Sequence, residues 1–320
     1  MSLEPERAGR DPGLWIAPQG WRAIERRIAG AFLMGCALVT VLTTIGIVIV
    51  LGTETIAFFR AGEVNPWRFL VGIEPEFDRL PIPEMSGILP LIWGTLVVAV
   101  GSSVVALPIG LLSAIFLSEY APPRLRAVLK PTLELLAGVP TIVYGYLALL
   151  LVTPALQAIF RPLGLEVGIF NALSACLVVG IMIIPMVSSL SEDVLSSVPR
   201  ALREGGYALG ATRFEVATRI VLPAGLSGVL ASFILAISRA IGETMAVVLA
   251  AGSVPNVSPN LLESVETMTA YIVQVIGGES APNSPERLSL YAVGMVLFLF
   301  TLGLNVASGA ILRRYREVYH

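Results

Sequence analysis

Two opposite charges inside an apolar stretch are the first residues of this sequence that could do chemistry. Arg239 and Glu243 lie four residues apart in ISRAIGETMAVV (residues 237–248), and they are the only ionisable residues of the apolar run 226–252. A charge at the centre of a bilayer costs about 2.5–3.5 kcal/mol even on a lenient scale, so such residues pair with each other or face water. The planar guanidinium, with its five N–H donors, suits bidentate binding of a tetrahedral oxyanion.

Two interpretations of this pair are open. The first is an i,i+4 ion pair that only neutralises itself, although arginine before glutamate is the less favourable order along a helix. The second is that Arg239 binds a passing oxyanion while Glu243 repels it enough to allow release. If residues 224–252 form one continuous helix, the two charges share a face with small residues, with Leu235 as the exception. These small residues are Gly228, Ser232, Ala236, Ala246 and Ala250. Small residues let helices approach closely or leave room for a pathway.

The elements that position the pair are predicted to be membrane helices. The chain has 320 residues, of which 55% are hydrophobic and 14% charged, and its mean hydropathy is +0.82; soluble domains are about 25% charged. Six apolar runs are long enough for a membrane span, which takes roughly 20 residues. They cover residues 28–59, 88–117, 134–160, 170–190, 224–252 and 289–312. We therefore expect an all-α integral membrane protein with six transmembrane helices.

The basic residues give the orientation of these helices. Of the 21 Lys and Arg residues, 15 lie in the N-terminal segment, the second and fourth connections and the C-terminal segment, and five lie in the other connections. The positive-inside rule then places both termini in the cytoplasm. The predicted parts are a cytoplasmic leader (1–27), a first transmembrane helix (28–59), an extracytoplasmic loop (60–87), a core of five transmembrane helices (88–315) and a cytoplasmic tail (316–320). Residues 261–276, in the last external connection, have a helical period that predicts a re-entrant or interfacial helix.

A polar segment between the fourth and fifth spans is bracketed by Pro199 and Pro223. It is long enough for two short helices along the membrane surface. Gly205, Gly206 and Gly210 are the predicted turn positions, because glycine accepts a positive φ at little cost. Such a knob suits docking into a groove on a partner, and an ordinary surface loop is the alternative.

This segment resembles the EAA motif of ABC-importer permeases, E-A-A-x3-G-x9-I-x-L-P. The matching residues are Glu204, Gly210, Ile220, Leu222 and Pro223. The resemblance implies that residues 200–219 couple the chain to an ATPase subunit. The motif has alanines where this chain has Gly205 and Gly206, and each glycine weakens a helix by about 0.5–1 kcal/mol. We therefore expect the first short helix to break at these two glycines.

A second resemblance lies in the charged stretch itself. ISRAIGETMAVV resembles the fifth-helix signature R-A-[IL]-G-E-T-[MA] of permeases in the phosphate-specific (Pst) ABC importer, and Met245 followed by Ala246 resembles the C-type permease. The likeness extends over about 86–315. It implies the type I, MetI-like permease fold and ATP-driven import of inorganic phosphate across the bacterial inner membrane. It also implies that Arg239 contacts the anion and that Glu243 modulates it. Thr244 is a weaker candidate, because its hydroxyl could simply bond back to its own helix.

The sequence offers no machinery for catalysis. A Walker A loop needs a lysine after glycines, and the only lysine, Lys130, has no glycine before it in PRLRAVLKPT. The only histidine is His320, and neither cysteine has a partner motif. We expect a non-catalytic subunit that binds no cofactor, with ATP and Mg on a partner ATPase. The resemblance implies a related A-type permease as heterodimer partner, two ATPase subunits and an extracytoplasmic phosphate-binding protein; no nucleic acid is expected.

Three alternatives remain open from the residues. A guanidinium does not by itself separate phosphate from sulfate, molybdate or a phosphonate, so the chain could serve another oxyanion importer. A secondary transporter could use Arg239 and Glu243 for ion coupling, although the EAA-like spacing weighs against it. A membrane scaffold or sensor would tolerate apolar replacement of the buried pair.

Overall fold

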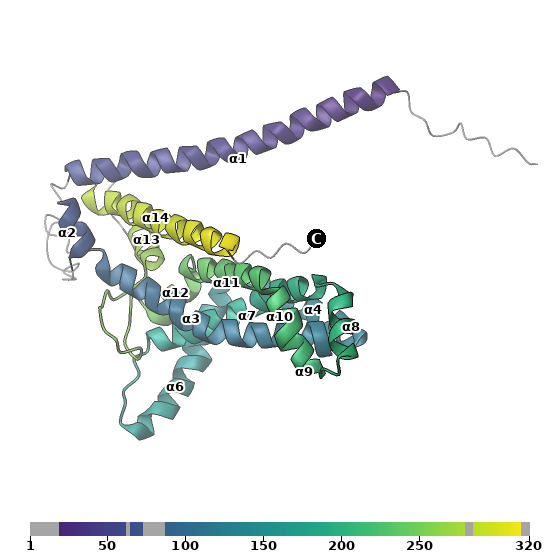
Figure 1. The fold of residues 1–320 in the computed structure, drawn as a ribbon. Coiled ribbons are helices and arrows are strands. Elements are labelled where there is room, and N and C mark those ends of the chain that lie inside the picture. Colours follow the sequence, from purple (N-terminus) through teal and green to yellow (C-terminus); the bar gives the residue numbers. More distant parts are fainter. Residues whose placement is uncertain (1–18, 62–64, 73–86, 279–283, 315–320) are drawn as a thin grey trace, which may run out of the picture. The chain divides into compact units, whose positions relative to one another are not determined.

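The computed structural model describes residues 19–61, 65–72, 87–278 and 284–314, and all regular structure among them is helical (Figure 1). The predicted tail 316–320, residues 1–18 of the leader and most of the loop 60–87 lie outside the described residues. The α-helices are α1 (Gln19–Ala61), α2 (Pro66–Val71), α3 (Leu89–Ile115), α4 (Pro123–Ala137), α5 (Thr141–Leu147), α6 (Thr153–Phe160), α7 (Ala172–Ser197), α8 (Arg200–Ala208), α9 (Arg213–Val216), α10 (Leu222–Ala224), α11 (Leu226–Ile241), α12 (Met245–Ala251), α13 (Met268–Gly277) and α14 (Pro285–Arg314). The π-helical segments are η1 (Phe116–Tyr120), η2 (Ala148–Val152) and η4 (Ala217–Val221), and η3 (Arg161–Leu163) is a 3-10 turn.

Among the described residues, five helical segments are long and apolar enough to cross a membrane. They are Arg27–Arg60, Leu89–Tyr120, Thr141–Leu163, Ala172–Ser197 and Glu286–Ala310. A bent pair, Arg213–Ala224 with Leu226–Ile241, raises the number to six if it counts as one span. The predicted fold class is thus confirmed.

The chain divides into two units, Met1–Thr53 and Glu54–His320. Most of α1 makes up the first unit, and its described side chains are largely exposed. The core of the second unit is the pair α3 and α7, which run side by side (Figure 1). Glycines allow this close approach: a Cβ on Gly110 would lie 2.6 Å from Val187 Cγ1, and one on Gly180 would lie 3.0 Å from Val105 Cβ. Small residues in this role are typical of packed membrane helices.

The prediction of one continuous helix over 224–252 is wrong. Helix α11 ends at Ile241, and α12 begins only at Met245. Gly242 caps α11, and its N–H donates to the carbonyl of Ser238 at 3.2 Å. Glycine directly after a helix and threonine directly before the next helix are residue types that commonly stop one helix and start another.

The start of the fifth span is also bent, by 74° between residues 213–224 and 226–241. Pro223 lacks the N–H that would continue the helical hydrogen bonding, and the π-helical η4 ends just before it. Gly225 then separates α10 from α11. The bend turns the chain from the segment bracketed by Pro199 and Pro223 into the membrane span.

The helix predicted over 261–276 is shorter than expected. Only α13, from Met268 to Gly277, is helical, and it begins where Thr267 Oγ1 accepts a hydrogen bond from the Ala270 N–H at 3.2 Å. The residues before it bond to other parts of the chain instead: Ala172 N–H donates to the Glu263 carbonyl at 2.9 Å. Tertiary hydrogen bonds therefore override the helical period in its first half.

Candidate functional site

Arg239 lies on the exposed side of α11 and lines a cavity. Ser232, Ala236 and Ala240, spaced four residues apart, are buried in the core, while Leu235 and Arg239 are exposed and line the cavity. Gly228, Ser232 and Ala236 share helix α11 with Arg239, but Ala246 and Ala250 lie on α12, so the predicted face of small residues does not continue beyond Ile241. The expected exception, Leu235, lines the cavity together with Arg239. The cavity has a volume of about 370 Å³ and its walls come from α4, α7 and α11. Its lining is Glu134, Ala137, Met182, Pro185, Met186, Ser189, Leu190, Leu235 and Arg239.

This cavity contains one cation, Arg239, and one carboxylate, Glu134, in otherwise largely apolar surroundings. Within the described part of the chain, Arg239 makes no hydrogen bond or ion pair. Its N–H donors are therefore available to a ligand, and Ser189 and Glu134 are the other hydrogen-bonding side chains apart from the methionines. The volume is many times the ~30 Å³ that one water occupies, so a small oxyanion fits.

Glu243 does not share this cavity. It lies in the break between α11 and α12, only 7% exposed, and its Oε1 accepts a hydrogen bond from the Ala246 N–H at 3.3 Å. Its carbonyl accepts another from Thr269 Oγ1 at 2.8 Å. Among the described residues no ion pair joins Glu243 to Arg239, so the self-neutralising pair is not what the structure shows. Both hydrogen bonds hold the break in place.

Thr244 bonds back to the chain, which is the reason that made it the weaker candidate for the substrate pathway. Its hydroxyl donates to the carbonyl of Gly242 at 3.3 Å. The structure therefore gathers Glu243 and Thr244 at the end of the helix that carries Arg239, but leaves only Arg239 on the cavity wall.

The segment bracketed by Pro199 and Pro223 forms two short helices, α8 and α9, as predicted. Gly210 is the turn between them, with φ of +83°. The expected break at Gly205 and Gly206 is wrong, because α8 runs through both. Gly206 is buried, and a Cβ there would lie 2.5 Å from Ile220 Cδ1 and 3.1 Å from Val216 Cγ2. Packing against η4 and α9 thus outweighs the weak helix propensity of glycine.

The other motif residues lie around this pair of helices. Glu204 is exposed on α8, Ile220 packs on Gly206 from η4, and Leu222 and Pro223 form α10. A family of transporters matches this region and the spans around it: the binding-protein-dependent transport system inner membrane component matches residues 106–317. The chain belongs to this family. It is a multi-pass inner-membrane permease component of an ABC transporter.

Relatives of this permease are ABC transporter permeases. The probable ABC transporter permease protein YqgH of Bacillus subtilis is 33% identical over 83% of this chain and 85% of its own. The phosphate transport system permease protein PstC of Xylella fastidiosa (strain Temecula1) is 36% identical over 73% and 76%, and that of Mesorhizobium japonicum is 34% identical over 69% and 72%.

Two solved transporters share the fold of the permease. The bacterial alginate ABC transporter in complex with an alginate-bound periplasmic protein matches with a TM-score of 0.62 and 18% identity, over 92% of this chain and 97% of that one. The MetNI methionine ABC transporter, in an inward-facing conformation, matches with a TM-score of 0.55 and 17% identity, over 72% and 96%. The predicted type I permease fold is confirmed.

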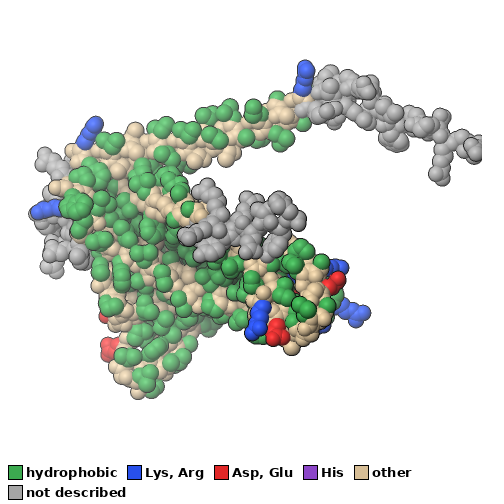
Figure 2. Space-filling model, viewed as in Figure 1, with side chains coloured by type: hydrophobic (Ala, Val, Ile, Leu, Met, Phe, Trp, Pro, Cys, Tyr) green, Lys and Arg blue, Asp and Glu red, His purple; other side chains and the backbone are tan. Residues whose placement is uncertain are grey.

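The tip of the permease's α8–α9 knob presents apolar side chains to the surroundings. Leu209 is 90% exposed and Phe214 is 68% exposed. Figure 2 shows charged side chains gathered over α8 and α9, whereas the surface of the long helices is mostly hydrophobic. A capping box fixes the start of α9: Thr212 Oγ1 accepts from the Glu215 N–H, and Glu215 Oε2 accepts from the Thr212 N–H at 2.9 Å. The capping box therefore stabilises the first turn of α9, the helix that carries Phe214.

A charged cluster between α4 and α7 was not predicted from the sequence. Glu192 is fully buried, and it binds Arg126, Lys130 Nζ at 2.8 Å and Ser196 Oγ at 2.7 Å. Lys130 also bonds Asp193. Burial lowers the pKa of Lys130, but the hydrogen bonds and charges of Asp193 and Glu192 outweigh it and raise that pKa overall.

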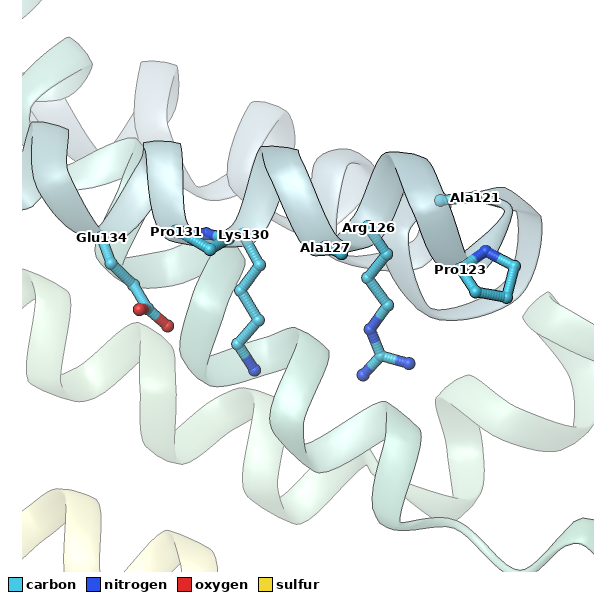
Figure 3. Close-up of a pocket in the computed structure, with 7 residues that line it drawn as sticks. All are labelled: Ala121, Pro123, Arg126, Ala127, Lys130, Pro131 and Glu134. Carbon is cyan, nitrogen blue, oxygen red and sulfur yellow. The ribbon is translucent and has the colours of Figure 1, made fainter.

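Two signals could have found this cluster: an acidic pair inside an apolar span, SLSEDVLSS, and basic residues four apart at 126 and 130. Arg126, Lys130 and Glu134 lie along one face of α4 and line a second cavity of about 420 Å³ (Figure 3). Glu134 lines both this cavity and the one that holds Arg239. Both cavities therefore border on Glu134 of α4.

Proposed function

We propose that this permease is the transmembrane subunit of an ATP-driven importer that moves inorganic phosphate into the cytoplasm by alternating access. The observation that carries the proposal is Arg239 in its cavity of about 370 Å³, where no described residue occupies its donors. The phosphate transport permeases among the relatives, at 34–36% identity, support phosphate as the oxyanion.

In this proposal Arg239 contacts the anion and partly offsets its charge. Glu243 and Thr244 contribute by holding the break directly after Arg239, because their hydrogen bonds fix the end of α11. Glu134 lines the same cavity as a carboxylate without a hydrogen bond in the described part of the chain. Its charge repels an anion and so favours release from a site that must not retain it.

The partners follow from the family and from the knob. The α8–α9 knob exposes Glu204 and the apolar side chains Leu209 and Phe214. Such a surface suits docking into a groove on an ATPase subunit. We assign ATP and Mg to two copies of that ATPase, and expect no cofactor and no catalysis on this chain. A related A-type permease would complete the translocation pathway, and an extracytoplasmic phosphate-binding protein would deliver the anion.

The test is uptake of radiolabelled phosphate by cells that lack their own phosphate importers and express this chain with its partner subunits. We expect uptake that depends on ATP and persists in excess sulfate. If excess sulfate abolishes the uptake, the substrate is a broader class of oxyanions and not phosphate alone. If uptake continues without a functional ATPase, the chain is not part of an ATP-driven importer.

A further inference from the structure

Arg203 lies on α8 directly before the exposed motif residue Glu204, but its side chain is turned inward. It is 16% exposed, and its partner Glu119 on η1 is 5% exposed. Nη2 of Arg203 donates to Glu119 Oε1 at 2.9 Å, and Nε lies 3.2 and 3.3 Å from the two carboxylate oxygens. This two-sided contact is the fork geometry that arginine makes with a carboxylate and that lysine cannot reproduce.

The remaining donors of Arg203 reach the end of α7. Nη1 donates to the carbonyl of Val198 at 2.5 Å, and Nη2 donates to that of Leu195 at 2.7 Å. The last carbonyls of a helix have no partner within the helix, and a cation beside them is favourable. One side chain therefore joins α8 to η1, which continues α3, and to the last turn of α7.

The other basic residues of the knob differ from Arg203. Arg200, Arg213 and Arg219 are exposed, and within the described part of the chain none of them forms an ion pair. The helices that Arg203 reaches are the ones that matter for the cavity: α3 and α7 pack on each other most extensively, and α7 supplies five residues of the Arg239 cavity wall.

We propose that Arg203 and Glu119 form the joint through which α8 moves as one body with α3 and α7. A partner's push on α8 then reaches the wall of the Arg239 cavity. The proposal rests on the proposed docking of α8 to an ATPase. Both residues position other groups and touch no substrate. Glu119 Oε1 also accepts a hydrogen bond from Ser118 Oγ at 2.8 Å, but Arg203 is its only cationic partner among the described residues. Movement of α8 alone would leave this buried carboxylate without a compensating cation, which is unfavourable, so α8 and the helices it contacts should move together.

The experiment uses the complete importer, with its partner permease, ATPases and binding protein, in proteoliposomes. Two quantities are measured together: phosphate moved per ATP hydrolysed, and stimulation of ATP hydrolysis by the binding protein. In Arg203→Lys we expect basal hydrolysis to persist while both quantities fall about fivefold or more, the range of a lost coupling free energy. Arg161→Lys, on the exposed turn η3, is the matched control and should change neither.

An Arg203→Lys complex that assembles and keeps both quantities at the unaltered values would overturn the joint. If Arg203→Lys does not assemble, Glu119→Gln is the second variant: the same loss is expected, and unchanged quantities overturn the proposal. Failure of the proposed function looks different, because the unaltered complex would then move no phosphate. Stimulation by the binding protein would still report on the joint in that case.

Discussion

Glu192 and Glu266 are both buried carboxylates, but their surroundings differ. Glu192 is 0% exposed and is met by two cations and a hydroxyl. Glu266 is 2% exposed, and its Oε1 has no hydrogen-bond partner among the described residues. Burial raises the pKa of Glu266 to about 8. For single residues, the presence of a compensating cation decides whether a buried carboxylate stabilises or destabilises the fold.

Replacement of Glu192 should destabilise the fold more than replacement of its neighbour Asp193. Glu192→Gln leaves Arg126 and Lys130 without a buried anion, and we expect a loss of about 1–3 kcal/mol because both cations are partly exposed. Asp193 is 57% exposed, so Asp193→Asn should cost less than about 1 kcal/mol. Thermal unfolding of the two variants in detergent measures the difference. Equal losses would show that burial of Glu192 does not matter.

Replacement of Glu266 should change the pH dependence of stability. The unfolded chain loses this proton near pH 4.5 and the folded chain near pH 8, so the folded state binds more protons between these values and loses stability as pH rises through them. Glu266→Gln should therefore melt at a higher temperature than the unaltered protein above about pH 8, and at a similar temperature below about pH 5.

Glu263→Gln is the matched control for this experiment. Hydrogen bonds from Asn260, Ser258 and Asn256 lower the pKa of Glu263, so its contribution to stability is present above about pH 4.5 and is lost as pH falls through the lower folded value. Its replacement should lower the melting temperature at high pH. If Glu266→Gln also lowers the melting temperature at high pH, the Glu266 side chain is not a neutral carboxyl without a partner in the folded protein.

At the scale of elements, α8 shows how packing and propensity divide between two adjacent glycines. Gly205 is exposed, and a Cβ added there would have nothing within 4 Å, whereas Gly206 faces Ile220 and Val216. Gly205→Ala should stabilise the protein by about 0.5–1 kcal/mol, the difference in helix propensity. Gly206→Ala should gain less or lose stability, because the Ile220 side chain must move. Melting temperatures of the two variants test this, and a larger gain for Gly206→Ala would contradict the packing.

The apolar tip of the knob should carry much of the binding to the ATPase. Leu209→Ser and Phe214→Ser should each weaken the affinity of the permease complex for the ATPase by about tenfold or more, as expected of apolar side chains buried at an interface centre. Leu163→Ser is the control, because Leu163 is also 68% exposed but lies on η3, away from the knob. An ATPase titration of the membrane complex gives the affinities. Equal effects of all three substitutions would rule out the knob as the contact.

The elements show which features the sequence reveals and which it hides. The length of the apolar runs predicts the membrane spans, and the spacing of the motif residues predicts the α8–α9 knob. Arg239 stands out as a charge inside an apolar run. All of these signals are local in the sequence. The break at Gly242 was also encoded locally, in Gly-Glu-Thr, but the apolar residues on both sides concealed it. The intact α8 and the clusters around Glu192 and Arg203 depend on tertiary contacts, and the ion-pair partners lie 62–84 residues apart in the sequence. No local pattern contains that information.

At the scale of the whole molecule, the proposed function depends on linking the knob to the cavity. Helix α7 takes part at both ends of this link: its last turn accepts hydrogen bonds from Arg203, and its middle lines the cavity with Arg239. Helix α4 is fixed to α7 through Glu192 and lines the same cavity. Motion of these helices would therefore change the access of an anion to Arg239.

The most direct test of Arg239 as the anion contact is phosphate uptake by the complete importer carrying Arg239→Gln, with Arg161→Gln as the control for loss of one positive charge elsewhere. Complex assembly is measured in parallel. We expect Arg239→Gln to lower uptake about tenfold or more, the effect of losing about 1.4 kcal/mol of anion stabilisation, and Arg161→Gln to leave uptake unchanged. An Arg239→Gln complex that assembles in normal amount and imports phosphate at the unaltered rate would show that Arg239 is not the anion contact.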